Sequence, residues 1–332
     1  MTNSNQVLFT VEEVTAKIAG GQPLLLAGEE QLLTQLPQGN WVGGSIPYFM
    51  ASQGGLKAND LIYVTEVPSY AVKTEVKVYD EQSLPQIYLD APENGFTLII
   101  IPASSSVHLS FALNAPNYEG FGTHPLIGWI SGTDLEVLGK ESAKVVDGRN
   151  RGVYEDAAVA MHVELPEGKY ADIDIVNIFN QGEGDTITFP ADGFSVQTAL
   201  VNGAEVNFAE YVKQQGIDTR FPLVANYNGS MINISYQSVD EDSGTVNFYA
   251  PVFKGVEYKQ ANKISDYVAE FTQQMPRDVS NMAFSCNCIL NYLHSELEGK
   301  QTGGVVGPIT FGEVAYQLLN QTLAYITIND LD

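Results

Sequence analysis

The chain has 332 residues and a formal net charge of −24, because 40 aspartates and glutamates outnumber 16 lysines and arginines. A surface this negative repels phosphate groups, which argues against a nucleic-acid partner and against binding to an anionic membrane. Hydrophobic residues make up 44% of the sequence, close to ordinary globular usage, so wholesale disorder is excluded.

Three features predict a cytoplasmic protein without a membrane segment. The first six residues are polar and carry no positive region before an apolar stretch, unlike a secretory signal. The longest run of branched aliphatic residues, 98–101, is far shorter than the roughly 20 residues of a membrane helix. Cys286 and Cys288 are separated by one residue, and a disulfide between them would close a strained ring.

The first third of the chain alternates helices and strands. Thr10 and Glu13 have the spacing of a capping box, which predicts a helix that ends at the Gly20-Gly21 pair. An apolar strand follows at 23–26, and a short helix with acidic residues at its start runs from Glu29 to Leu36. Residues 41–50 form a glycine-rich strand and turn.

The middle of the chain is predicted to be mostly strands. These segments carry β-branched or aromatic residues between turn signals: 61–64, 71–79, 96–101, 126–130, 157–165 and 173–178. Helices are expected at 105–113 and 208–215, and a hairpin at 231–239 and 245–252. The acidic segment 240–244 lacks the glycine and glutamate positions of a calcium loop, so it is interpreted as the tip of this hairpin.

Strands and helices alternate again in the last third. Apolar residues at helical spacing predict helices over 264–275 and 289–297, and a shorter helix over 313–319. Strands are expected at 279–284, 305–311 and 323–328. These elements predict an α+β fold with mixed, largely antiparallel sheets and flanking helices. No low-complexity linker divides the chain, so any two halves must pack together closely.

Cys286 and Cys288 fall where a strand should end and a helix begin. Free backbone amides and the helix dipole at such a junction favour a thiolate, which would suit a nucleophile. His294 lies about 120° around the helix from Cys288, a poor position for a base. The alternative is that both cysteines are small buried apolar residues.

Sequence motifs give little sign of metal or cofactor chemistry. Two cysteines supply at most two metal ligands, and the histidines, at 108, 124, 162 and 294, show no metal-binding spacing. No phosphate loop, dinucleotide fingerprint, serine elbow or zincin helix occurs. We therefore expect no metal and no cofactor, and the near-empty inventory of enzyme signatures favours a non-enzymatic protein.

Arginine is rare, and Arg149 and Arg151 stand close together in the segment 147–152. A planar guanidinium binds a carboxylate through two parallel hydrogen bonds, which suits a small anionic ligand. Alternatively, the two arginines are exposed loop residues that offset neighbouring acids such as Asp147 and Glu155.

Several short motifs give the chain a resemblance to a known family. In the C-terminal part these are 284–286, Glu296 and 306–314; upstream they are 125–129 with Gly132, 153–159 and 221–224. In this order they resemble the FIST (F-box and intracellular signal transduction) domain, a sensory module, over residues 40–328. The chain departs from that pattern after Cys286, where the family usually has an arginine. The resemblance implies two related halves, 1–200 and 201–332, and a role in sensing small ligands such as amino acids.

Together these observations predict a stand-alone cytoplasmic protein that binds a small ligand and acts either as a receptor by itself or through a signalling protein partner. The predicted pocket lies between the halves, near the end of the Cys286 strand and the two glycine-containing turns at 44–49 and 307–312. Its candidate residues are Cys286, Cys288, Glu313, Trp129, Tyr48 and Phe311, with Arg149 or Arg151 holding an anionic group. Glu313 would accept a ligand amine or cap a short helix. The alternatives are a cysteine-dependent enzyme using Cys286 or Cys288, and a structural or partner-binding protein without a pocket.

Overall fold

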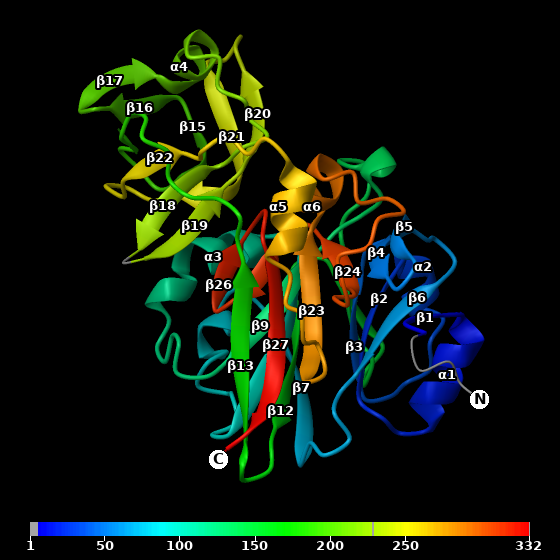
Figure 1. Ribbon diagram of the computed structural model, residues 1–332. Helices are drawn as coiled ribbons and strands as arrows, with labels where there is room; N and C mark the ends of the chain where they lie inside the picture. Colours follow the sequence, from blue (N-terminus) through cyan, green and yellow to red (C-terminus); the bar gives the residue numbers. More distant parts are fainter. Residues whose placement is uncertain (1–5, 228, 332) are drawn as a thin grey trace. The chain divides into compact units, whose positions relative to one another are not determined.

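The computed structural model describes residues 6–227 and 229–331 (Figure 1). The chain forms two compact units. Unit 1 comprises the chain up to residue 176, residues 275–318 and residues from 323 onward, and unit 2 comprises 177–274 and 319–322. The predicted boundary at residue 200 lies within unit 2, and a relationship between the predicted halves stays a prediction.

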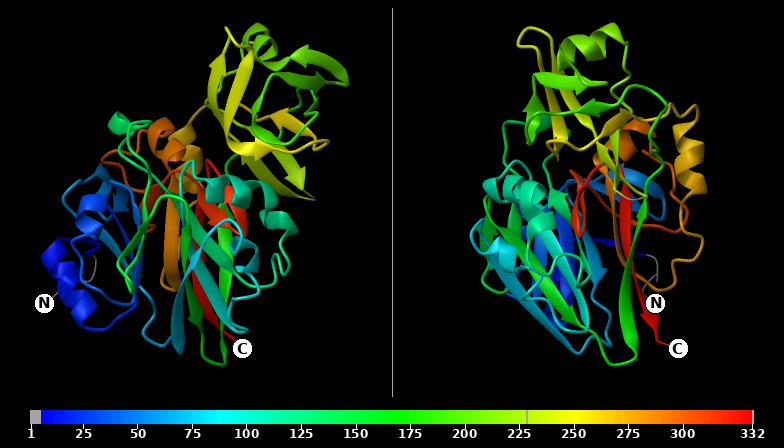
Figure 2. Two further views of the ribbon diagram at one scale, coloured as in Figure 1. Left: turned by 180° about the vertical axis from the view of Figure 1, so that it is seen from behind. Right: turned by 90° about the vertical axis from the view of Figure 1, so that its left-hand side faces the viewer.

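Unit 1 is built from sheets that draw strands from distant parts of the chain (Figures 1 and 2). The first sheet has the order β1 (Leu8–Phe9), β6 (Ile62–Glu66), β2 (Leu24–Gly28), β3 (Trp41–Ser45), β10 (Val145–Asp147), β11 (Gly152–Tyr154). The second has the order β26 (Gln317–Leu319), β25 (Glu313–Ala315), β9 (Leu126–Ser131), β8 (Gly95–Pro102), β12 (Ala158–Glu164), β7 (Lys73–Tyr79). The third has the order β13 (Lys169–Val176), β27 (Leu323–Asp330), β23 (Met282–Cys288), β24 (Gly307–Thr310), β4 (Tyr48–Ala51), β5 (Gly54–Lys57).

The sheets confirm the predicted α+β class. Pairings such as β13 with β27 are antiparallel, whereas β2/β3, β8/β9 and β23/β24 are parallel. The second sheet contacts the first sheet through β3 and β10, and it contacts the third sheet through β24 and β27. Every residue of β8 and β9 is buried, which explains their near-continuous apolar sequences.

Short helices flank these sheets: α1 (Val11–Ala19), α2 (Glu30–Leu33), α3 (Ser106–Asn114) and α6 (Ile289–His294), with 3₁₀ turns at Leu84–Gln86, Ala115–Asn117 and Leu135–Val137. Of these, α1 and α2 pack against one face of the first sheet. The capping box of α1 is confirmed, because the Glu13 amide donates to Thr10 Oγ1 and the Thr10 amide donates to Glu13 Oε2. The junction after Cys288 is also confirmed, since β23 ends there and α6 begins at Ile289.

The predicted helix over 313–319 is wrong. These residues form β25 and β26 on the edge of the second sheet, where Glu313 pairs with Trp129 and Ala315 pairs with Ile127. Tyr316 has a φ of 62°, in the left-handed region, which interrupts any right-handed helix. The apolar residues of this segment are buried at the edge of a sheet and do not form the face of a helix. The strand predicted at 279–284 is also displaced, because β23 extends to Cys288.

Unit 2 contains two sheets and the helices α4 (Phe208–Gln214) and α5 (Tyr267–Gln273) among its described residues. One sheet has the order β17 (Ala204–Asn207), β16 (Thr198–Val201), β14 (Ile187–Thr188), β22 (Tyr258–Gln260), β18 (Leu223–Tyr227), β19 (Ser230–Ile234). The other has the order β15 (Gly193–Val196), β21 (Thr245–Val252), β20 (Tyr236–Asp240). The predicted hairpin tip is confirmed, because β20 and β21 pair on either side of 241–244. In the part of the chain that the structure describes, no helix is long and apolar enough to span a membrane.

Candidate functional site

The chain passes from the third sheet to the second sheet between Thr310, the last residue of β24, and Glu313, the first residue of β25. This crossing segment ties the carboxyl ends of β9 and β23 together. The Ile130 amide donates to Gly312 O at 2.8 Å, Thr310 Oγ1 lies 3.0 Å from the same oxygen, and Thr310 Oγ1 lies 3.3 Å from Asn287 O. The ends of β9 and β23 are therefore both hydrogen-bonded to this crossing segment.

Buried polar atoms without partners occur both just after β9 and at the end of β23. Ser131 Oγ, Thr133 Oγ1 and Asn287 Nδ2 have no hydrogen-bond partner among the described residues, although their side chains are 0%, 7% and 3% exposed. The Asn287 amide orientation is set by Asn291 Nδ2, which donates to Asn287 Oδ1 at 2.9 Å. Leaving a buried polar group unsatisfied costs about 1–3 kcal/mol. The Ser131 and Thr133 hydroxyls can donate a hydrogen bond to a molecule that the chain itself does not supply. Asn287 lies on the other face of β23 from Cys286, toward Asn291 of α6, so it does not belong with these two hydroxyls.

A buried acidic side chain completes what we call the strand-end cluster: Ser131, Thr133, Thr310 and Glu313. Glu313 is fully buried, and Thr310 Oγ1 lies 3.3 Å from its Oε1. Since Glu313 belongs to a strand, it does not cap a helix. Two hydroxyl groups without partners among the described residues and an acidic side chain at adjoining strand ends can bind a molecule with both an acceptor and a donor group.

The cysteines lie beside this cluster but are not poised as nucleophiles. Cys286 and Cys288 are each 1% exposed. Cys286 Sγ donates to Gly128 O at 3.2 Å, so it carries its proton. Burial, with smaller contributions from Glu313 and Cys288, raises the pKa of the Cys286 thiol well above its ordinary value. The expectation of a thiolate at Cys286 is therefore wrong, because burial outweighs the amides of the following helix.

The predicted apolar walls surround the same region. Phe311 lies against Gly132, where an added Cβ would stand 2.4 Å from the Phe311 ring. Tyr48 OH donates to Asp134 Oδ1 at 3.0 Å and accepts from the Leu135 amide. Trp129 is a core residue whose ring occupies the space above Gly44, and it is the register partner of Glu313.

The structure does not bring the two arginines to the strand-end cluster. Ser45, at the carboxyl end of β3, donates to Gly132 O, whereas Asp147 pairs with Val42 near the amino end of β3. Arg149 and Arg151 follow Asp147, so they lie toward that far end. Arg149 Nη2 donates to Val76 O, and Arg151 Nη2 donates to Thr34 O at 3.3 Å.

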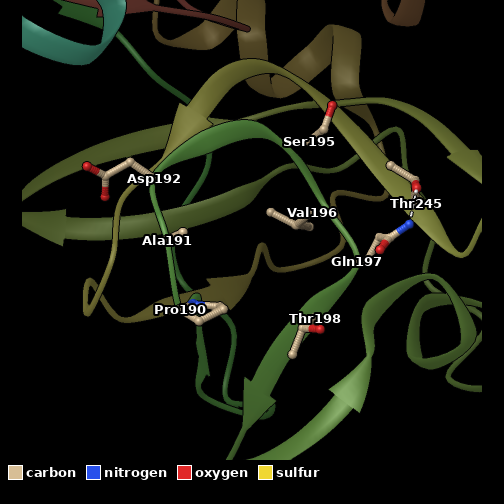
Figure 3. Close-up of a pocket in the computed structure, with 8 residues that line it drawn as sticks. All are labelled: Pro190, Ala191, Asp192, Ser195, Val196, Gln197, Thr198 and Thr245. Atoms are coloured by element: carbon tan, nitrogen blue, oxygen red, sulfur yellow. Dashed lines mark hydrogen bonds between the residues drawn. The ribbon is translucent and has the colours of Figure 1, made fainter.

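Unit 2 has a pocket of its own, shown in Figure 3. It has a volume of about 450 Å³ and is lined by Pro190, Ala191, Asp192, Ser195, Val196, Gln197, Thr198 and Thr245. Gln197 Nε2 points toward Thr245 Oγ1 at 3.2 Å and also donates to Ser243 O (Figure 3). Gln197 therefore has hydrogen-bond partners within the protein, unlike the hydroxyls of Ser131 and Thr133 in the strand-end cluster. For this reason the strand-end cluster is the stronger candidate for a ligand site. Within the described residues, no group of three or more His, Cys, Asp or Glu side chains could hold a metal ion.

The sequence predicted Cys286, Cys288, Glu313 and Phe311 near one another but missed the polar donors. Ser131 and Thr133 flank Gly132 directly after a fully buried strand, and this position at a strand end was the signal that could have identified them.

The chain belongs to a family of unknown function, DUF6976, whose model matches residues 9–329. No curated protein matches the chain. Because the family has no assigned activity, the expectation of a FIST-type sensory role stays a prediction.

Proposed function

We propose that the protein binds a small molecule at the strand-end cluster of unit 1 and acts as a ligand-binding protein of the sensory type. The observation that carries this proposal is the pair of buried hydroxyls without partners among the described residues, Ser131 Oγ and Thr133 Oγ1. A cytoplasmic location and a signalling partner, which the FIST resemblance implies, belong to the same proposal.

The chemistry of the cluster favours a small zwitterion such as an amino acid. Two hydroxyl groups suit the oxygens of a carboxylate, because charge-assisted hydrogen bonds are the strongest of their kind. The buried Glu313 carboxylate supplies an acceptor for a ligand ammonium group. A ligand held by its two charged ends at adjoining strand ends would offset the cost of leaving these donors unsatisfied.

Calorimetric titration and thermal shift with a panel of amino acids and small carboxylic acids test the proposal. A true ligand at 100 times its Kd should stabilise the folded protein by about 2.7 kcal/mol. We expect at least one amino acid to raise the melting temperature in a concentration-dependent way. If no compound of the panel binds, the proposal of an amino-acid ligand is wrong.

Matched variants locate the site. Ser131→Ala and Thr133→Val remove hydroxyls that have no partner among the described residues, so both proteins should fold while ligand affinity falls about tenfold. Ser52→Ala is the control, since Ser52 is exposed and outside the cluster. Unchanged affinity in both cluster variants would show that the ligand binds elsewhere.

A further inference from the structure

A second candidate site lies along β7, the edge strand of the second sheet, and is independent of the proposed function. β7 pairs with β12 on one side, and among the described residues no strand pairs with its other side. Unpaired strand edges offer backbone groups to another chain.

The hydrogen-bonding pattern shows which groups point outward from β7. The Val76 carbonyl accepts from Arg149 Nη2, so it faces away from β12. In an antiparallel ladder, the N–H and C=O of one residue face the same side, and alternate residues face opposite sides. Thr74, Val76 and Val78 therefore direct their backbone groups outward, whereas Glu75 and Lys77 bond to β12.

A groove follows this edge. It has a volume of about 670 Å³, and its lining includes the consecutive β7 residues 75–79. Its other walls come from the loop after β7 and from the β10–β11 hairpin: Ser83, Gln86, Asp90, Asp147, Arg149, Asn150 and Tyr154. An extended chain occupies roughly 160 Å³ per residue, from a rise of about 3.3 Å and spacings of about 4.8 and 10 Å. The groove therefore holds about four residues of a strand.

The two faces of β7 meet different charges. On one face, Lys77 Nζ lies 3.2 Å from Asp90 and 3.6 Å from Glu75. Val76 lies on the other face, toward β10, where the Arg149 side chain is 43% exposed. Asp147, the acid nearest to Arg149, is fully buried, and it accepts hydrogen bonds from the Arg149 amide and from Asn150 Nδ2. Arg149 thus has donors left for an incoming acidic side chain.

We propose that this groove binds an extended peptide segment of a partner protein by β-strand addition, with an acidic residue opposite Val76 facing Arg149. Main-chain hydrogen bonds to Thr74, Val76 and Val78 supply affinity, and alternate side chains supply specificity. Opposite charges favour a basic residue across from Glu75 and an acidic residue across from Lys77. An N–H group of the incoming strand replaces Arg149 Nη2 as the donor to the Val76 carbonyl. The released Arg149 guanidinium then pairs with the acidic residue.

The probe is a fluorescein-labelled peptide, Thr-Val-Glu-Glu-Lys-Val-Thr-amide, which carries this pattern for antiparallel pairing. Its second, fourth and sixth residues lie opposite Val78, Val76 and Thr74 and donate their N–H groups to β7. Fluorescence anisotropy should show saturable binding with a Kd below about 1 mM. N-methylation at the second, fourth and sixth residues should abolish binding, whereas N-methylation at the third and fifth should leave it unchanged.

Arg149 is tested by a double-mutant cycle. Arg149→Ala and replacement of the fourth peptide residue by alanine should each weaken binding about threefold to tenfold, and the two changes together should cost no more than either alone. In the protein, Val78→Pro removes an outward N–H without removing a bond to β12, so it should abolish binding while the melting temperature is largely retained. Absence of binding, or equal loss from both sets of N-methylated peptides, would overturn the proposal.

Discussion

Acid should destabilise this protein through a buried histidine in the second sheet. His162 is 4% exposed and lies in a chain of hydrogen bonds. Thr97 Oγ1 is 2.7 Å from His162 Nδ1, Tyr79 OH is 2.8 Å from His162 Nε2, and Tyr79 OH donates to Asp90 at 2.9 Å. Since the Tyr79 proton goes to Asp90, His162 Nε2 carries a proton. Burial lowers the pKa of His162, so near neutral pH the imidazole is neutral and its Nδ1 accepts from Thr97.

The magnitude follows from the pKa. Burial, with a smaller contribution from Lys77, lowers the pKa of His162 to about 4. In the unfolded chain the pKa of a histidine is about 6.5, so the unfolded chain takes up a proton first as the pH falls. The stability contributed by neutral His162 is complete above about pH 6.5, falls by about 2 kcal/mol by pH 5, and is reduced by about 3 kcal/mol once the pH passes about 4.

Urea unfolding between pH 7.5 and pH 4.5 measures this effect in wild type, His162→Gln and Thr97→Val. The difference in unfolding free energy between wild type and His162→Gln should shrink by about 2 kcal/mol between pH 7 and pH 5. Thr97→Val removes a hydrogen-bond partner but keeps the titrating imidazole, so its pH dependence should follow wild type. Comparison with His162→Gln also separates this effect from that of His108, whose pKa burial likewise lowers to about 4. Parallel pH profiles for wild type and His162→Gln would refute the reasoning.

Three further predictions test the core and the strand ends. Ser131→Ala should raise the unfolding free energy of the unliganded protein by about 1 kcal/mol in urea titrations, because it removes a buried hydroxyl without a partner among the described residues; a loss of stability would contradict this. Gly128→Ala should lower the unfolding free energy by at least about 3 kcal/mol, because the added methyl would stand 1.8 Å from Ile99 O. In the control Gly184→Ala the added methyl has nothing within 4 Å, so the unfolding free energy should stay within about 0.5 kcal/mol of wild type. Cys286 should resist iodoacetamide at neutral pH until urea unfolds the protein, and rapid labelling found by mass spectrometry would show that its burial is wrong.

Local patterns predicted much of the fold. The capping box at Thr10, the strand end at Cys288 and the hairpin tip at 240–244 all depend on neighbouring residues, so the sequence alone was enough for them. The segment 313–319 was different, because its apolar spacing fits a helix and also a buried sheet edge. Only the pairing with β9, far away in sequence, decides between them.

The candidate site was predicted in part for the same reason. Glu313 and Phe311 lie within thirty residues of Cys286 in the sequence, and the structure gathers them at one strand end. Arg149 attracted attention because arginine is rare, but composition carries no information about which end of a sheet a loop occupies. The donors Ser131 and Thr133 are ordinary polar residues in the sequence, and only their burial without partners marks them.

The order of strands in the third sheet has a consequence for synthesis on the ribosome. β27, the last strand in the sequence, lies between β13 and β23, and both pair with it along most of their length. Until residue 330 has emerged from the ribosome, β13 and β23 each have an unpaired edge where β27 will bind. For β13 this period includes the synthesis of residues 177–274 of unit 2. Such edges pair readily with other chains. The edge of β13 therefore stays open to pairing with another chain until β27 has been synthesised, and rapid insertion of β27 protects the protein from such pairing.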